Sequence, residues 1–295
     1  MEDSIFNSST ELPDSAIEQR TKNLIGFEDN FKRVFANLKI LIDQDGLFKW
    51  SQKYHGTELP FIHQLAQRYP LIILSGDVGT GKTVSAEGFA DRTVRELKKE
   101  GFLLKLSTRV RGEGLHGQMG NLVNDVFSEL KTQAGKKRLA FLLIDEADAV
   151  ASTRSTLQMH QEEKAAVNTL IQKIDETRDL KGRAIVIMST NRIHFIDEAI
   201  LRRAALILEF KRPNDSERKE LFSRNLAGLN LDNNQIQELS YLCSPERNNN
   251  LGHSYSDIVL KILPEAISVC YPNKPLSFKI LCHTINNIKP SPQII

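Results

Sequence analysis

The sequence of 295 residues has few cysteines and no long apolar run. Its three cysteines, Cys243, Cys270 and Cys282, lie far apart, so they indicate neither a disulfide framework nor a spaced set of zinc ligands. No apolar stretch reaches the roughly 20 residues needed to cross a bilayer, and residues 1–3 lack the basic region of a signal peptide. We therefore expect a reduced, cytoplasmic protein with no membrane anchor.

An excess of charge of one sign is also missing. Lys and Arg number 39 and Asp and Glu 37, for a formal net charge of +2, which does not favour a nucleic acid as partner. Local basic clusters of the kind that usually face solvent still leave a DNA-handling protein as an alternative. The basic residues concerned are Arg109, Arg111, Lys136, Lys137 and Arg138.

What the chain does contain is a glycine-rich loop directly after an apolar run. Residues 71–74 predict a buried strand, and the loop after it ends in Lys-Thr. Its residues are Gly76, Asp77, Val78, Gly79, Thr80, Gly81, Lys82 and Thr83. The glycines let backbone N–H groups and the start of the next helix face an anionic phosphate chain. The pattern is that of a P-loop, in which Lys82 contacts the β- and γ-phosphates of a nucleotide and the Thr83 hydroxyl ligates Mg²⁺.

A second apolar run, residues 139–144, ends in Asp145 and Glu146. Parallel strands are buried on both faces and bind ligands beyond their carboxyl ends, so these carboxylates are expected at the nucleotide. Asp145 then orients Mg²⁺ through its water shell, and Glu146 activates the attacking water. An acidic helix cap is the alternative, and the upstream P-loop favours catalysis.

The letters Asp-Glu-Ala-Asp also occur in RNA helicases, but the next strand argues against that class. The apolar residues 184–188 lead into Ser189, Thr190 and Asn191, where a helicase of that family has Ser-Ala-Thr. Asn191 is a polar amide that we expect beside the γ-phosphate.

Two arginines follow a short apolar helix that begins near Asp197. Arg202 and Arg203 are both candidates for an arginine finger. A fixed guanidinium stabilises the charge that spreads over a transferring phosphoryl group, and a neighbouring subunit can supply it. The residues alone leave the choice between the two open.

In this order and spacing, these segments resemble an AAA+ ATPase over residues 24 to about 268. The resemblance implies an α/β P-loop NTPase fold, with a parallel-sheet α/β/α core and a small helical lid domain after it. It also implies ATP and Mg²⁺ as cofactors and a homo-hexamer. We expect a flexible tail over residues 1–22, because they are polar with few apolar anchors. The large domain should cover residues 23–212 and the lid residues 213–295.

Two flanking segments add to the resemblance. Ile25 and Gly26 resemble the linker that lies near the adenine, and residues 252–258 resemble a Gly-x-Ser-Gly-x-Asp-Leu segment of the lid. No basic residue stands among residues 256–258, where many members place a second phosphate-sensing arginine. Lys261, one helical turn further on, is either a substitute or a solvated residue.

One branch of the family is favoured by local sequence. Residues 166–175 and 196–199, with the Arg203-Ala204 pair, resemble the pachytene-checkpoint branch, whose members remodel HORMA-domain proteins. The resemblance implies a hexamer that partly unfolds a HORMA-domain client and disassembles its complexes. In bacterial members it implies regulation of antiphage signalling by a cyclic-oligonucleotide nucleotidyltransferase. Arg203 fits the Arg-Ala pair of this branch better than Arg202.

A pore loop is the remaining expected element. Leu115, His116 and Gly117 stand where such rings carry an aromatic-hydrophobic-Gly loop that grips the client, with Leu115 in the aromatic position. Two alternatives remain at this stage. One is a DNA-handling AAA+ ATPase, such as a loader or a transposition regulator, and the other is an ATP-controlled scaffold, which the intact Glu146 and Arg203 argue against.

Overall fold

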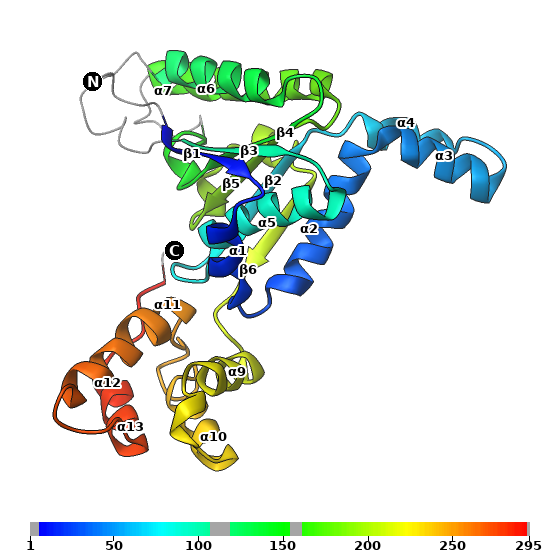
Figure 1. Ribbon diagram of the computed structural model, residues 1–295. Helices are drawn as coiled ribbons and strands as arrows, with labels where there is room; N and C mark the ends of the chain where they lie inside the picture. The colour runs from blue at the N-terminus through cyan, green and yellow to red at the C-terminus, as the bar shows by residue number, and fades with distance from the viewer. Residues whose placement is uncertain (1–5, 107–118, 154–160, 294–295) are drawn as a thin grey trace. The chain divides into compact units, whose positions relative to one another are not determined.

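The structure is a computed structural model that describes residues 6–106, 119–153 and 161–293 (Figure 1). The chain divides by its contacts into two compact units. Unit 1 comprises Met1–Asn23, Phe27–Ser75 and Thr83–Glu209, and unit 2 comprises Leu24–Gly26, Gly76–Lys82 and Phe210–Ile295. Unit 2 therefore contains the expected lid and, in addition, most of the glycine-rich loop.

The described strands form a six-stranded sheet in the order β1-β3-β4-β5-β2-β6. The strands are β1 Phe6–Leu12, β2 Leu71–Gly76, β3 Gly101–Leu106, β4 Leu139–Ile144, β5 Ala184–Thr190 and β6 Leu206–Phe210. Strands β3, β4, β5 and β2 pair in parallel, whereas β1 is antiparallel to β3. The expected parallel core is confirmed, and β1 makes the whole sheet mixed.

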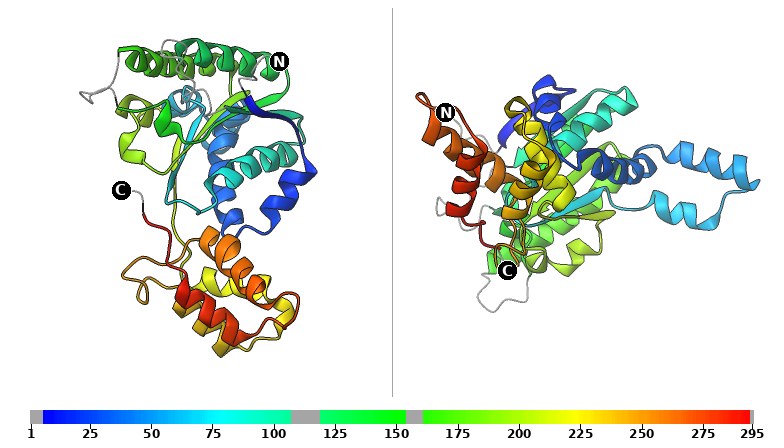
Figure 2. Two further views of the ribbon diagram at one scale, coloured as in Figure 1. Left: turned by 90° about the vertical axis from the view of Figure 1, so that its left-hand side faces the viewer. Right: turned by 90° about the horizontal axis from the view of Figure 1, so that it is seen from below.

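The three predicted apolar strands are confirmed as the buried centre of this sheet. Every residue of β4 and β5 is buried, as are the first five of β2. Helices cover both faces: α6 and α7 pack on one side through Leu130, Leu170 and Ile174, and α2 and α5 lie on the other (Figures 1 and 2). The arrangement is the α/β/α core that the apolar runs predict.

Among the described residues, four α-helices lie between β1 and β2, and one α-helix lies between each of the later strands and the next. They are α1 Ser15–Lys22, α2 Phe27–Ile42, α3 Gln44–His55, α4 Pro60–Ala66, α5 Lys82–Leu97, α6 Met119–Ala134, α7 Gln161–Glu176 and α8 Glu198–Leu201. Short 3₁₀ turns occupy Ala147–Ala149, Thr177–Leu180, Ile193–Phe195 and Ala227–Leu229.

The prediction of a flexible tail over residues 1–22 is wrong for its described part, residues 6–22. Strand β1 pairs with β3, and α1 follows it. Two apolar side chains anchor the segment, since Leu12 is 3% and Ile17 is 2% exposed. Composition missed this because the polar residues of an edge strand are held through their backbone, to which the pairing supplies hydrogen bonds.

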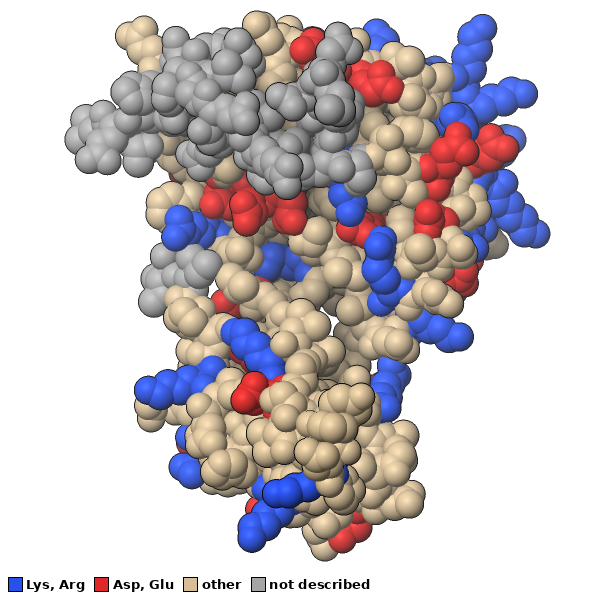
Figure 3. All heavy atoms as spheres, turned by 60° about the vertical axis from the view of Figure 1, so that its left-hand side comes forward, with Lys and Arg blue, Asp and Glu red and all other residues tan. Residues whose placement is uncertain are grey.

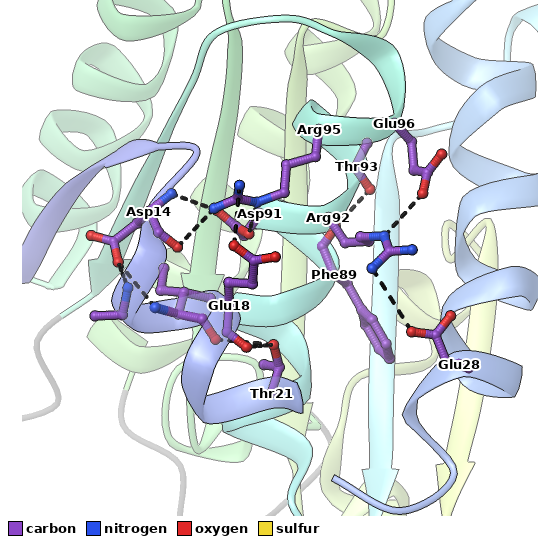
Figure 4. A network of polar contacts seen from close by, with 12 residues as sticks. Asp14, Glu18, Thr21, Glu28, Phe89, Asp91, Arg92, Thr93, Arg95 and Glu96 are labelled. Atoms are coloured by element: carbon purple, nitrogen blue, oxygen red, sulfur yellow. Dashed lines mark hydrogen bonds and ion pairs between the residues drawn. The ribbon is translucent and has the colours of Figure 1, made fainter. Parts of the chain in front are cut away.

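Ionic contacts fasten the same segment to α5 (Figure 4). The backbone N–H of Asp14 donates to Asp91 Oδ1 over 2.6 Å, and Arg95 donates to both Asp91 Oδ2 and the Asp14 carbonyl, over 2.7 and 3.1 Å. Arg95 also pairs with Glu18 at 3.2 Å. These contacts raise the pKa of Arg95, chiefly through its hydrogen bond to Asp91, so residues 14–18 are an ordered part of unit 1.

The long segment of unit 2 is a small helical domain. Its helices are α9 Asp215–Asn225, α10 Asn233–Leu242, α11 Tyr255–Asp257, a π-helical turn at Ile258–Ile262, α12 Leu263–Cys270 and α13 Phe278–Asn287. A core of Phe222, Leu239, Ile262 and Leu281, each fully buried, holds them together. Helices α9, α10 and α11 each begin with a capping box, which satisfies N–H groups that the first turn leaves without partners.

Cys243 and Cys270 are buried, and like Cys282 they are free thiols. Burial raises the pKa of the Cys243 thiol to about 12, so this side chain behaves as a small apolar core residue. None of the helices within the described ranges has the length and apolarity that a membrane crossing requires.

Candidate functional site

The carboxyl ends of three neighbouring strands lie at one edge of the sheet. Ser75 of β2 is in register with Thr190 of β5, and Ile144 of β4 is in register with Met188 of β5. The residues that follow these strands are therefore brought to a common edge, where parallel sheets bind their ligands.

Asp145 is held there by two hydroxyl groups. Thr83 Oγ1, in the first turn of α5, donates to Asp145 Oδ2 over 2.9 Å, and Ser189 Oγ at the end of β5 donates to Asp145 Oδ1. A hydroxyl facing a carboxylate is the oxygen donor set that suits Mg²⁺, which keeps most of its other ligands as water or phosphate oxygens. No cluster of three or more His, Cys, Asp or Glu that would enclose a metal occurs in the described residues, so Thr83 and Asp145 fit Mg²⁺ better than a metal caged by the protein alone.

Glu146 lies next to this pair with its side chain exposed. Its φ is 48°, in the left-handed region, and its backbone N–H donates to Asp145 Oδ1 over 3.0 Å. Residues other than glycine seldom adopt such a φ, and functional residues are frequent among those that do. Because the side chain is exposed, water can reach the Glu146 carboxylate.

Asn191 directly follows β5 and is partly buried. The residue before it is fixed, because Thr190 Oγ1 donates to Asp148 Oδ1 over 2.8 Å and accepts from the Arg192 N–H over 2.9 Å. Sequence reasoning assigned no role to Asp148 or to the contact of Ser189 with Asp145. The signal for Asp148 was its place three residues after Asp145, one 3₁₀ turn further along.

The glycine-rich loop of unit 2 has the conformation that its glycines permit. Gly76, Gly79 and Gly81 have φ values of 139°, 73° and 88°. Space is short as well, because a Cβ on Gly76 would lie 2.0 Å from the Phe210 carbonyl oxygen. Glycine is therefore required at position 76 both by conformation and by the close approach of another backbone.

Lys82 is nearly buried and turns back into its own loop. Its Nζ donates to the carbonyl oxygens of Gly76 and Asp77, over 3.0 and 2.7 Å, and Thr80 Oγ1 donates to the same Asp77 oxygen over 2.8 Å. The Val78 N–H donates to Asp77 Oδ1 over 2.8 Å. The loop thus gathers an ammonium group and the N-terminus of α5, both of which attract anions.

The two expected linker residues belong to unit 2. Ile25 packs against the core of the helical domain. Gly26 has a φ of 73°, and a Cβ there would lie 3.5 Å from Glu217 Oε1.

The two finger candidates have different surroundings. Arg203 donates to both carboxylate oxygens of Asp175, over 2.5 and 3.0 Å, and to the Ala199 carbonyl over 2.9 Å. Its guanidinium lies 5.3 Å from the centre of the Tyr69 ring, and its hydrogen bond to the Asp175 carboxylate raises the pKa of Arg203. Arg202 is 79% exposed and pairs with Glu198 at 3.0 Å. Arg203 is therefore the guanidinium with the fixed orientation.

Leu115, His116 and Gly117 lie outside the described residues, as do Arg109 and Arg111 of the basic clusters.

Of the described residues in these basic clusters, Arg138 has acidic partners. Arg138 pairs with Glu11 at 3.2 Å and lies 3.7 Å from Glu100. On the face in Figure 3, acidic side chains likewise lie among the lysines and arginines. Arg138 is therefore paired with acidic side chains in this structure.

Comparisons with known proteins show the family of the chain. The model of the AAA family, the ATPase family associated with various cellular activities, matches residues 72–212. The chain is 43% identical over 290 residues to CD-NTase-associated protein 6 of Escherichia coli strain KTE188, covering 98% of this chain and 97% of that protein.

Solved structures resemble the chain over nearly its whole length. A chain in the structure of the E. coli MS115-1 HORMA:CdnC:Trip13 complex is 36% identical with a TM-score of 0.92, over 98% of this chain and 97% of that one. Rhizobiales Trip13 is 29% identical with a TM-score of 0.77, over 97% and 99% of the two chains.

Proposed function

The chain belongs to the AAA family of ATPases, and on that premise we propose that it works as a homo-hexamer that partly unfolds a HORMA-domain protein and disassembles its complexes. One observation carries the proposal: the whole chain matches the fold of a protein whose structure was solved together with HORMA and CdnC. The relative's designation as CD-NTase-associated supports a role in bacterial antiphage signalling by a cyclic-oligonucleotide nucleotidyltransferase, in the cytoplasm.

The phosphate-binding residues have separate tasks in this proposal. ATP with Mg²⁺ supplies the phosphoryl group that is transferred and the positive charge that makes it reactive. With ATP bound, Lys82 would contact phosphate oxygens in place of the Gly76 and Asp77 carbonyls. Thr83 offers its hydroxyl to the metal, and Asp145 orients the metal's water shell while Ser189 holds the carboxylate in place.

The catalytic residues act on the attacking water and on the developing charge. Glu146 accepts the proton of the water, for which its exposed carboxylate is suited, and Asn191 contacts the γ-phosphate. Arg203 would contact the nucleotide of the neighbouring subunit. Asp175 and Tyr69 hold its guanidinium in one orientation, and a preorganised guanidinium loses less entropy on binding.

Capture of the client tests the proposal. Glu146→Gln protein, held in ATP and mixed with lysate of the source organism, should retain a HORMA-domain protein that mass spectrometry identifies. Lys82→Ala protein is the matched control, because it lacks the phosphate contact and should retain none. Retention of nuclease-sensitive DNA with replication proteins, and of no HORMA-domain protein, would replace the proposal by the DNA-handling alternative.

Leu115, His116 and Gly117 are the proposed grip on the client. Leu115→Ala should slow remodelling, measured as release of a labelled partner from a HORMA-domain protein, because a smaller side chain packs less well against an extended chain. Lys82→Ala gives the level of complete loss. Remodelling by Leu115→Ala at the wild-type rate would remove these residues from the mechanism.

A further inference from the structure

Arg212, two residues after β6, is tied to three separate segments of unit 2. Its Nε donates to Asp77 Oδ2 over 2.6 Å, its Nη1 to the Gly252 carbonyl over 2.6 Å and its Nη2 to the Ser291 carbonyl over 2.7 Å. The Arg212 side chain is 11% exposed and that of Asp77 8%. Such a buried, charge-assisted arrangement is much more restrictive than a surface ion pair.

The first of these segments is the P-loop itself. The Asp77 carbonyl accepts from Lys82 Nζ, and the Asp77 carboxylate accepts from the Val78 N–H. A displacement of Asp77 therefore shifts the carbonyl that holds Lys82. The carboxylate is also a negative charge in a loop proposed to bind phosphates, and Arg212 is the cation that compensates it.

The third segment, residues 288–291, lies near the carboxyl end of the described chain. The Ile288 carbonyl oxygen lies 2.8 Å from His253 Nε2. The Ser291 N–H donates to Asp257 Oδ2 over 3.1 Å and Ser291 Oγ donates to Asp257 Oδ1 over 2.5 Å. Contacts other than those with Arg212 therefore hold the segment at both of its ends, Ile288 and Ser291.

Asp257 is a firm anchor for that segment. Its side chain is fully buried, and Lys261 Nζ bonds both Asp257 Oδ1 and Ser291 Oγ, over 2.8 and 2.6 Å. Burial alone would raise the pKa of Asp257, but hydrogen bonds from Lys261 and Ser291 hold it well below its usual range. Lys261 is therefore tied to both Asp257 and Ser291, although its side chain is 52% exposed.

We propose that Arg212 is a positioning residue that couples the seating of residues 288–291 to the ATP affinity of the P-loop through Asp77. With the segment in place, the Arg212 guanidinium has three acceptors, and its positive charge compensates that of the Asp77 carboxylate. With the segment displaced, Arg212 loses the Ser291 carbonyl and its hold on Asp77 loosens. The proposal rests on the proposed function, since it requires that residues 76–83 bind the phosphates of ATP.

The first experiment compares nucleotide affinity and turnover in the full-length protein. Affinity is measured by fluorescence titration with the N-methylanthraniloyl derivative of ADP, and KM and kcat by steady-state ATP hydrolysis. Arg212→Ala should raise the dissociation constant and KM about tenfold or more, because it leaves a buried carboxylate unpaired beside the phosphates. The value of kcat should change by less than about threefold, because no proposed catalytic side chain contacts Arg212.

Rescue distinguishes this role from a merely structural one. The double variant Arg212→Ala with Asp77→Asn has no unpaired carboxylate and should regain most of the lost affinity. A double variant as weak as Arg212→Ala alone would overturn the coupling through Asp77. If Arg212→Ala protein lacks the wild-type circular dichroism, Arg212→Lys carries the test, because it keeps the charge but cannot reach three acceptors from one planar group.

Two truncations test the role of the segment without changing the core. A chain that ends at Lys289 lacks Ser291, whereas a chain that ends at Pro292 keeps it. The shorter chain should bind the fluorescent ADP several-fold more weakly, and the longer chain as wild type does; equal affinities would overturn the proposal.

Failure of the proposed function has a different outcome. If the wild-type protein binds no nucleotide, both proposals fall. If wild type binds and Lys82→Ala does not, while Arg212→Ala binds as wild type does, the coupling alone is wrong.

Discussion

Two parts of the proposed site are positioned in different ways: the strand-end group, which is Asp145 and Ser189, and the P-loop, residues 76–83. Asp145 and Ser189 extend from neighbouring strands of one sheet, so their contact follows from the pairing of β4 with β5. The P-loop is instead braced by chain that comes much later: the Phe210 carbonyl lies against Gly76, and Arg212 bonds Asp77. The strand-end group is therefore suited to a fixed catalytic geometry, and the loop to an affinity that other parts of unit 2 can adjust. Variants of the first should change turnover, and variants of the second should change nucleotide binding.

The largest effect is expected from substitution of Arg203, the proposed arginine finger. Arg203→Ala should lower kcat about a thousandfold or more and leave the affinity for the fluorescent ADP near that of wild type, because the arginine serves the neighbouring subunit. Steady-state ATP hydrolysis measures the loss, with Arg202→Ala as the matched control. A greater loss in Arg202→Ala would reverse the assignment of the two residues.

The second largest effect is expected from substitution of Glu146, the proposed general base. Glu146→Gln should lower kcat about a hundredfold or more while ATP stays bound, because the amide keeps the shape of the side chain but accepts a proton poorly. Retention of radiolabelled ATP after gel filtration measures binding, and phosphate release measures turnover. Near-normal turnover in this variant would assign the activation of water to another group.

A clash in the P-loop should affect binding rather than the chemical step. Gly76→Ala places a Cβ 2.0 Å from the Phe210 carbonyl at a φ of 139°, so the loop must shift. The affinity for the fluorescent ADP should fall about tenfold to a hundredfold. Gly228→Ala is the control, since a Cβ there meets nothing within 4 Å. Equal affinity of both variants would show that the loop tolerates the displacement.

The smallest effect concerns pH and the anchoring of residues 288–291. Burial lowers the pKa of His253, whose ring contacts the Ile288 carbonyl. A lowered folded-state pKa means that the unfolded chain binds the proton more readily, so stability is lost as pH falls below about 6.5, the ordinary value for His. Thermal unfolding between pH 8 and pH 5 measures this loss. A His253→Gln variant with the same pH dependence as wild type would assign the loss to other groups.

Local patterns predicted much of the fold. The apolar runs at residues 71–74, 139–144 and 184–188 are the buried strands β2, β4 and β5, because a strand buried on both faces must be apolar throughout. Residues 6–22 were mistaken for a tail, since their order depends on β3 and on Arg95, which lie about 80 to 100 positions later along the chain and leave no trace in local composition.

The amino-acid sequence by itself determined the glycine-rich loop with its lysine, the carboxylates after β4 and the family to which the chain belongs. Each of these is a contiguous run whose residue types suit only a narrow range of chemistry. Only the tertiary structure decided which side chains contact one another at the site. Ser189 meets Asp145 from 44 positions away, Arg203 meets Asp175 from 28 and Arg212 meets Asp77 from 135. The direction of a side chain across such separations depends on how helices and strands pack together, and no local pattern carries that information.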